Sequence, residues 1–251
     1  LNKIDALVHL AAQPSVPISI ENFGASSSSN ILGSIKVIDF CRKEDIPLVY
    51  ASSSAIYGDL EKGDDQNSNI DLLSPYATDK YIMELYAKTA YKIYQLSSIG
   101  LRFFNVYGPR QDPTNPYSGV ISIFTDRLLN GSSIKIYGGF QTRDFIYIND
   151  VVEAIFKSIN IVKKNTLCEQ VNVLTGKNIS IDKIANILAD EIGVKVDKEY
   201  YDLLQGDPEK SKGSTKKMTK FLRLNLNDMA TMKYGLKETI NYMKIGNKKN
   251  E

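Results

Sequence analysis

Residues 47–54, Pro47-Leu-Val-Tyr-Ala-Ser-Ser-Ser54, predict a short buried strand that ends in a run of hydroxyl side chains. Twenty residues later, Ser74-Pro-Tyr-Ala-Thr-Asp-Lys80 predicts the start of a helix, with its serine as N-cap and its proline as first helical residue. The apolar pattern extends this helix to about Leu96, and the next strand runs from Ile99 to Phe104. A strand, a helix and a strand in this order favour a parallel sheet covered by helices.

The same alternation continues on both sides of this stretch. Upstream, Ile4–Ala12 predicts a buried strand, and Asn30–Cys41 predicts an amphipathic helix. Downstream of residue 105 the elements become shorter and more broken, which favours a smaller α/β unit built on the carboxyl ends of the first sheet. Its predicted strands are 134–137, 143–148 and 171–174, and its predicted helices are 120–130, 150–161 and 181–192. The lysine-rich stretch 210–220 predicts a solvated loop.

The composition excludes several classes of protein. Of the 251 residues, 43% are hydrophobic and 24% charged, and 31 basic against 29 acidic residues give a net charge of only +2. No apolar stretch approaches the ~18 residues of a membrane span. The single histidine, His9, excludes a multi-histidine metal site, and Cys41 and Cys168 form no CxxC pair. We therefore expect no metal, no nucleic-acid partner, no membrane partner and a cytoplasmic location.

Tyr76 and Lys80 are the first candidates for chemistry. They lie four residues apart, so they point the same way from the first turns of one helix. A lysine ammonium beside a phenol favours the phenolate and lowers a pKa that starts near ~10. The hydroxyls of residues 52–54 lie at the carboxyl end of a strand, the edge where parallel sheets bind ligands. The sequence therefore predicts an acid/base pair at this edge.

Several blocks of sequence occur in the order found in one family. They are His9-Leu-Ala-Ala-Gln13, Asn30, Ser52-Ser-Ser-Ala-Ile-Tyr-Gly58, Ser74–Lys80, Leu101-Arg-Phe-Phe-Asn-Val-Tyr-Gly-Pro-Arg110, Gln141-Thr-Arg-Asp-Phe145 and Gly235-Leu-Lys-Glu-Thr239. On these residues the chain resembles the extended short-chain dehydrogenase/reductase family, specifically its NAD-dependent nucleotide-sugar epimerases. The resemblance implies an α/β fold, with a Rossmann-like doubly wound parallel sheet and a smaller C-terminal α/β substrate domain.

The resemblance also implies roles for matching residues. Tyr76 would be the catalytic base, Lys80 its electrostatic partner, and Ser53 the hydroxyl that hydrogen-bonds the sugar. The implied NAD-binding residues are Leu10, Ala11, Ala12, Asn30, Ser52, Tyr76, Lys80 and Phe103. The implied substrate-binding residues are Ser53, Asn105, Val120, Tyr137, Arg143 and Ser211. Asn105 and Arg143 would hold the diphosphate, Val120 and Tyr137 would lie near the base, and the small Ser211 would admit an N-acetyl group.

Plainer interpretations of the same residues stay open at this point. Leu10, Ala11 and Ala12 would then be close packing at a strand end, and Arg143 a surface ion-pair partner. Asn105 would be a turn residue and Ser211 part of the lysine-rich loop. Val120 and Tyr137 would be ordinary core residues.

The resemblance divides the chain into two parts. Residues 1–111, joined by 143–175, would be the remainder of the NAD-binding domain, and residues 112–142 and 176–251 the substrate-binding domain. The glycine-rich turn that receives the pyrophosphate would precede residue 1, so we expect the first βαβ portion to lie outside this chain. We expect the 251 residues alone to be weakly active or inactive.

The implied reaction is the NAD-dependent 4-epimerisation of a UDP-hexose through a transient 4-keto sugar. A 4,6-dehydratase or decarboxylase of the same family is one alternative, although Ser54 and Ala55 stand where those relatives tend to carry acidic residues. An inactive fragment or binding protein is the other. The resemblance further implies a homodimer formed through the helices near 31–42 and 76–96.

Overall fold

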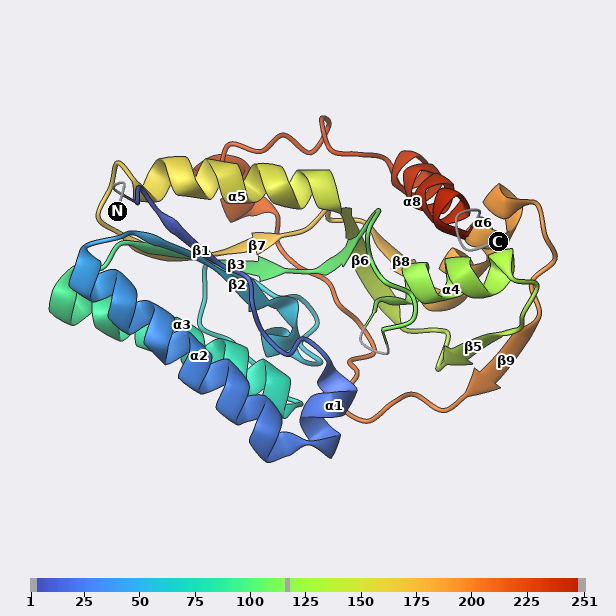
Figure 1. Cartoon of the computed structure of the whole chain (residues 1–251), viewed down its shortest axis with the longest axis horizontal. Coiled ribbons are helices and arrows are strands. Elements are labelled where there is room, and N and C mark those ends of the chain that lie inside the picture. The colour runs from blue at the N-terminus through green and yellow to red at the C-terminus, as the bar shows by residue number, and fades with distance from the viewer. Residues whose placement is uncertain (1–3, 116–117, 248–251) are drawn as a thin grey trace.

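Four parallel strands form the larger sheet in the computed structural model of the chain, which describes residues 4–115 and 118–247 (Figure 1). In spatial order they are β1 (Leu7–His9), β2 (Leu48–Ser53), β3 (Ser98–Phe103) and β7 (Cys168–Val173). The register places Ser52 opposite Arg102, and Arg102 opposite Asn172. Because the strands are parallel, their carboxyl ends share one edge of the sheet, the edge at which ligands bind in such folds.

Strand β1 is shorter and more exposed than the sequence predicts. Only Leu7–His9 pair with β2, and β1 is an edge strand of this sheet within the described residues. The side chains of Val8 and Leu10 are 36% and 52% exposed. The prediction of a buried strand over Ile4–Ala12 is therefore wrong, because an edge strand has a neighbour on one side only and its faces are incompletely covered.

Helices cover both faces of the sheet. The helices α2 (Phe23–Glu44) and α3 (Pro75–Tyr94) pack side by side on one face, and α5 (Ile148–Val162) covers the other (Figure 1). Alternation along β2 buries Leu48 and Tyr50 in the cluster formed with α2 and α3 and Val49 in the cluster formed with α5. This is the doubly wound α/β arrangement that the sequence predicts.

The ends of α3 follow the predicted signals, whereas the start of α2 does not. The hydroxyl of Ser74 accepts a hydrogen bond from the Ala77 amide at 3.2 Å, and Pro75 is the first helical residue. Helix α2 begins already at Phe23, after the short helix α1 (Val16–Glu21). The serine-rich start of α2 is a weak helix former, but its buried side chains pack against neighbouring elements, and this packing outweighs propensity.

Much of the chain after residue 105 forms a smaller α/β unit, which lies in the right half of Figure 1. The predicted helix 150–161 and strand 171–174 do not belong to it, because α5 and β7 are part of the larger sheet and its cover. Its strands are β4 (Asn105–Tyr107), β6 (Thr142–Tyr147) and β8 (Asn178–Ser180) in one sheet, and β5 (Ile134–Tyr137) and β9 (Lys198–Tyr201) in a two-stranded ribbon. Its helices are α4 (Val120–Leu129), α6 (Ile181–Ile192) and α8 (Met232–Asn247). These elements share one apolar core. Strand β5 and helix α6 match their predicted bounds residue for residue.

The lysine-rich stretch 210–220 is only partly a loop. Helix α7 (Lys216–Phe221) occupies its second half, and its Met218 is fully buried in the core under α5. The prediction of a solvated loop is wrong for this half, because the lysines lie around one apolar anchor. Within the part of the chain that the structure describes, no helix has the length and apolarity that a membrane crossing requires.

Candidate active site

Helix α3 presents one row of polar side chains to the end of strand β2. Tyr76, Lys80 and Glu84 follow one another at four-residue spacing, so they lie on one face of the helix. The Lys80 ammonium donates a hydrogen bond to the Ala51 carbonyl oxygen at 2.8 Å. The Tyr76 phenol lies near Ser53 at the end of the same strand, close enough for the Ser53 side chain to lower the phenol pKa. The structure thus brings together the three residues predicted as catalytic.

The environment of Tyr76 differs from the one predicted. Burial raises the pKa of its phenol. The neighbouring Ser53 side chain lowers that pKa, and the Asp79 carboxylate raises it. The Lys80 ammonium nitrogen lies 5.8 Å from the centroid of the Tyr76 ring. The expectation of a lowered phenol pKa is wrong for this structure, because taking the phenolate out of water outweighs the favourable contacts.

Lys80 is buried as well, and only 7% of the residue is exposed. Burial lowers the pKa of its ammonium to about 8, against the opposing effect of the Asp79 carboxylate. An ammonium has three N–H donors, and among the described residues one of them bonds Ala51. Two donors therefore remain for a ligand at this edge of the sheet.

Replacing Lys80 by Met should remove a pH-dependent part of the stability. The native pKa of about 8 lies below the ordinary 10.5, so between these values the unfolded chain binds more protons. The free energy of unfolding of the unaltered protein should therefore rise with pH over this window, by up to about 3 kcal/mol. Lys80→Met should be the more stable protein below pH 8 and should lack this rise. Urea unfolding from about pH 7 to pH 10.5 measures both.

The matched control is Lys92→Met, which removes an exposed lysine from the last turn of the same helix. This variant should retain the rise of the unaltered protein. A Lys80→Met variant with an unchanged rise between pH 8 and 10.5 would show that Lys80 is not the group responsible.

A buried ion pair fastens the middle of α3 to the sheet. The Arg102 guanidinium donates to Glu84 through Nε at 2.9 Å and through Nη2 at 2.7 Å, and Ser52 Oγ donates to Glu84 at 2.5 Å. The two charged side chains are 7% and 4% exposed. Arg102 also donates to the Tyr57 hydroxyl at 2.7 Å, which donates to Asn172 Oδ1 at 2.6 Å. The network therefore connects α3 with three neighbouring segments of chain.

Glu84→Ala should lower the free energy of unfolding by about 3–5 kcal/mol, because it leaves the Arg102 guanidinium buried without its partner. The double variant Glu84→Met, Arg102→Met should lose less than the single variant, since it leaves no uncompensated charge. Urea unfolding of the two variants is the measurement. A double variant that is less stable than the single one would contradict the argument.

Asn30 ties α2 to α3 and to the chain that follows β1. Its Nδ2 donates to the Gln13 carbonyl oxygen and to Asp79 Oδ2, both at 3.1 Å, and its Oδ1 accepts from the Gln13 amide at 2.8 Å. Leu10 and Ala11, which precede Gln13, are exposed at the carboxyl end of β1. The chain at Leu10 and Ala11 is therefore exposed, and the Asn30 side-chain amide is held in place by its hydrogen bonds to the neighbouring Gln13.

Three other residues predicted at the cofactor are only partly oriented for that role. The Ser52 hydroxyl is engaged by Glu84, so a contact of Ser52 with a ligand would use its backbone. The Phe103 ring is half-buried and packs on the core beneath α5. Ala12 is half-buried.

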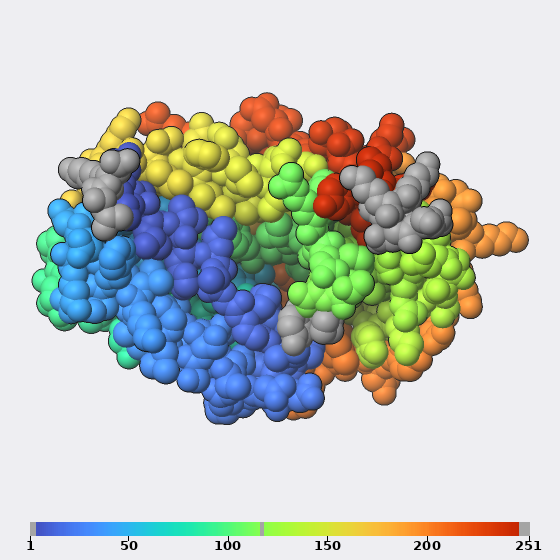
Figure 2. Space-filling view, viewed as in Figure 1, coloured from blue at the N-terminus to red at the C-terminus, as the bar shows by residue number. Residues whose placement is uncertain are grey.

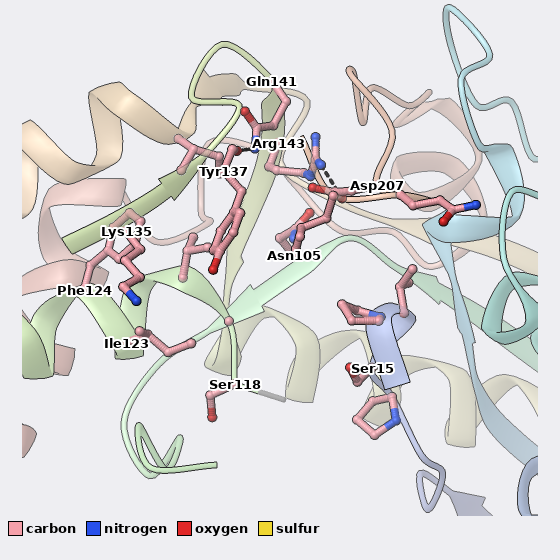
Figure 3. A pocket seen from close by; sticks show the side chains of 18 of the residues that line it. Ser15, Asn105, Ser118, Ile123, Phe124, Lys135, Tyr137, Gln141, Arg143 and Asp207 are labelled. Atoms are coloured by element: carbon pink, nitrogen blue, oxygen red, sulfur yellow. Dashed lines mark hydrogen bonds and ion pairs between the residues drawn. The ribbon is translucent and has the colours of Figure 1, made fainter. Parts of the chain in front are cut away.

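A cavity of about 500 Å³ lies between the two halves of the chain. In Figure 2 the N-terminal segment (blue) meets residues of the 100–130 region (green) at a hollow in the surface. Four of the six predicted substrate-binding residues line this cavity: Asn105, Val120, Tyr137 and Arg143. Asn105, Tyr137 and Arg143 are labelled in Figure 3. Its volume is in the range of ligand sites.

The other two predicted substrate residues lie outside this lining. Ser53 is at the end of β2 with Tyr76. Ser211 lies alongside β6, where its amide donates to the Thr142 carbonyl at 3.0 Å and its own carbonyl accepts from Asn178 at 2.6 Å. Its contact with a sugar substituent stays a prediction.

Arg143 is largely buried and forms an ion pair with Asp207, as Figure 3 shows. The plainer interpretation of Arg143 as a surface ion-pair partner is correct for the ion pair and wrong for the surface, since only 6% of Arg143 is exposed. The ion pair does not exclude ligand binding, because both residues line the cavity. Sequence reasoning named no role for Asp207, nor for Arg127 and Lys135, which also line it. Alternation along β5 could have found Lys135, since it shares a strand face with Tyr137.

A tyrosine–lysine pair and a hydroxyl at the carboxyl edge of a doubly wound sheet place the protein among the short-chain dehydrogenases/reductases. A model of the NAD dependent epimerase/dehydratase family matches residues 1–173. The chain belongs to this family, as its resemblance predicts, and NAD is the cofactor of the family.

Several relatives are named as epimerases of sugar nucleotides. The chain is 37% identical over 249 residues to a putative UDP-glucose 4-epimerase of Methanocaldococcus jannaschii, covering 98% of this chain and 79% of the relative. The structure of a UDP-N-acetylglucosamine 4-epimerase from Methanobrevibacter ruminantium, in complex with UDP-N-acetylmuramic acid, superimposes with a TM-score of 0.87 at 33% identity, over 96% of this chain and 77% of that one. A Thermus thermophilus UDP-glucose 4-epimerase in complex with NAD gives a TM-score of 0.84 at 29% identity, over 96% and 78%.

Proposed function

We propose that the protein is an NAD-dependent 4-epimerase of nucleotide sugars and acts on UDP-hexoses, including N-acetylated ones. The observation that carries the proposal is that Tyr76, Lys80 and Ser53 meet at the carboxyl edge of the parallel sheet, while Asn105 and Arg143 line a cavity between the two halves of the chain. Relatives over nearly the whole chain are named for this activity.

The residues at the carboxyl edge of the sheet fit the cofactor of the family. Lys80 has two N–H donors left for ribose hydroxyls, and the open chain at Leu10 and Ala11 leaves room for a ring system. Together with Lys80, the residues that would hold the group are Ala12, Asn30, Ser52, Tyr76 and Phe103. NAD, when bound, accepts a hydride from the sugar and returns it.

The chain itself supplies the proton chemistry. The Tyr76 oxygen would take the proton of the sugar 4-hydroxyl as the 4-keto sugar forms, and would return it to the epimeric alkoxide. Ser53 would hydrogen-bond the same sugar oxygen and hold it in reach of Tyr76. The Lys80 ammonium, while protonated, would favour the phenolate form that the reaction requires.

The cavity would hold the remainder of the substrate. The Arg143 guanidinium suits the geometry of a phosphate, and the Asn105 amide would donate beside it. Val120 and Tyr137 would flank the base. In this proposal residues 1–111 and 143–175 carry the cofactor and the chemistry and contribute Asn105 and Arg143 to the substrate site. Residues 112–142 and 176–251 form the substrate-binding domain.

The segment after Ser53 favours epimerisation over elimination of water. Residues 54–57 form a short 3-10 helix, and residues 54–58 contain no carboxylate. Elimination requires a base and an acid at the neighbouring carbon, and Ser54 and Ala55 provide neither.

The test of the function is a coupled assay on UDP-glucose, UDP-galactose and their N-acetylated forms, with protein expressed from its complete reading frame. We expect formation of the 4-epimer. Accumulation of a 4-keto-6-deoxy sugar would instead identify a dehydratase, and absence of any turnover would contradict the proposal.

Tyr76→Phe should lower kcat by about 10²–10⁴-fold and leave NAD bound, because the phenyl ring keeps the packing but exchanges no proton. Turnover measures the first effect and the absorbance of bound cofactor the second. Tyr81→Phe, on the next turn of α3, is the control and should retain activity. Unchanged turnover of Tyr76→Phe would show that another group is the base.

We also propose that the protein is a homodimer through α2 and α3. Large apolar side chains on the outer surfaces of these helices are 43–63% exposed: Leu32, Phe40, Leu85, Tyr86 and Ile93. Leu32 and Phe40 are eight residues apart, so they share one face of α2.

Light scattering of the unaltered protein should give twice the mass of one chain. The double variant Leu32→Glu, Ile93→Glu should give the mass of one chain, because it places charges on the apolar surfaces of both helices. A monomer in the unaltered protein would contradict the proposal.

The location that we propose is the cytoplasm. Both Cys41 and Cys168 are free thiols, which suits a reducing compartment.

A further inference from the structure

Lys135 is a cation in the nucleotide cavity that the argument so far leaves without a role. Exposed and buried side chains alternate along β5, so Lys135 and Tyr137 share the face that lines the cavity. The neighbouring strand β9 places Glu199 opposite Lys135 and Tyr201 opposite Tyr137. The ribbon therefore presents one ammonium and one phenol ring at the cavity, and the Tyr201 ring lies 5.3 Å from the Tyr137 ring.

The expected partner of Lys135 is engaged elsewhere. The Glu199 carboxylate accepts hydrogen bonds from Ser133 Oγ at 2.5 Å and from the Tyr201 hydroxyl at 2.9 Å. The Lys135 ammonium instead lies 5.7 Å from the centroid of the Tyr201 ring. Within the described residues, Lys135 has no ion pair and no hydrogen bond, and its ammonium is available to a ligand.

The two other cations of the cavity are occupied. Arg143 pairs with Asp207, and Arg127 donates through Nη1 to the Ser133 carbonyl oxygen at 2.9 Å. In the view of Figure 3, Tyr137 lies between Lys135 and Arg143, and Ile123 and Phe124 lie near Lys135. Lys135 thus belongs to the apolar, aromatic part of the cavity, away from the guanidinium that would bind the diphosphate.

We propose that Lys135 donates a hydrogen bond to O4 of a uracil ring and thereby selects UDP-sugars over CDP-sugars. An ammonium has three donors and no acceptor. Uracil, like thymine, presents a carbonyl oxygen at position 4, whereas cytosine presents an amino group there. Opposite cytosine, the lysine and the amino group would be two donors facing each other, and neither would be satisfied.

This inference rests on the proposed function, because it takes the ligand of the cavity to be a nucleotide. A contact with the diphosphate is the rival role for Lys135. The position of Arg143 and Asn105 on the other side of Tyr137 favours the base over the phosphates (Figure 3). Uridine, which has the base and no phosphate, separates the two roles.

The test is calorimetric binding of UDP, CDP and uridine to the protein from its complete reading frame and to Lys135→Met. The unaltered protein should bind UDP at least tenfold more tightly than CDP. Lys135→Met should weaken the binding of UDP and of uridine by about tenfold and that of CDP little, so the preference disappears. Lys135→Arg, which keeps the charge and the donors, should retain most of it.

Lys195→Met removes an exposed lysine shortly before β9 and serves as the matched control, which should bind all three ligands as the unaltered protein does. Equal weakening of UDP and CDP, or unchanged uridine binding by Lys135→Met, would overturn the inference and leave the proposed function intact. If the unaltered protein bound no UDP, the proposed function would fail and the inference with it.

Discussion

The buried ion pair between Glu84 and Arg102 fixes how α3 lies on the sheet. Taking two charges out of water is costly, and the cost is offset only when every polar atom finds a partner, as the bonds to Ser52 and Tyr57 achieve here. A rotation or slide of α3 would break several of these bonds at once. Because Tyr76 lies two turns away on the same helix face, this constraint also aims its phenol at the end of β2.

The same network reaches the segment that carries Asp207, one of the residues that line the cavity. The Asn172 side chain, at the end of the hydrogen bonds from Arg102 and Tyr57, donates to the carbonyl oxygens of Gly63 and Ser214. Gly63 in turn pairs with the chain on both sides of Gly213. Asp207 and its ion pair with Arg143 belong to the segment that runs into this anchor. One set of buried polar contacts therefore positions both the proton chemistry and one wall of the cavity.

The sequence predicted those structural features that depend on residues close together along the chain. The cap of α3 follows from Ser74 and Pro75, and the bounds of β5 follow from alternation. Features that depend on distant chain were missed. The exposure of β1 depends on what covers it, and the pairing of Arg143 with Asp207 joins residues far apart in sequence. Spacing placed Tyr76 near Lys80 but carries no measure of burial, so the direction of the phenol pKa was predicted wrongly.

Burial decides what each cation of the two sites can do. Lys80 is enclosed, so its pKa falls to about 8 and its charge is sensitive to the pH and to any ligand beside it. Arg143 is enclosed too, but Asp207 compensates its charge, so an arriving anion must share the guanidinium with that carboxylate. Lys135 is exposed, and among the described residues it has no ion pair and no hydrogen bond, so a ligand would compete only with its contact to the Tyr201 ring. A lysine without an ion pair suits a neutral carbonyl oxygen. A hydrogen bond to such an oxygen involves little charge on the ligand, so it would not compensate a cation for the loss of an existing ion pair.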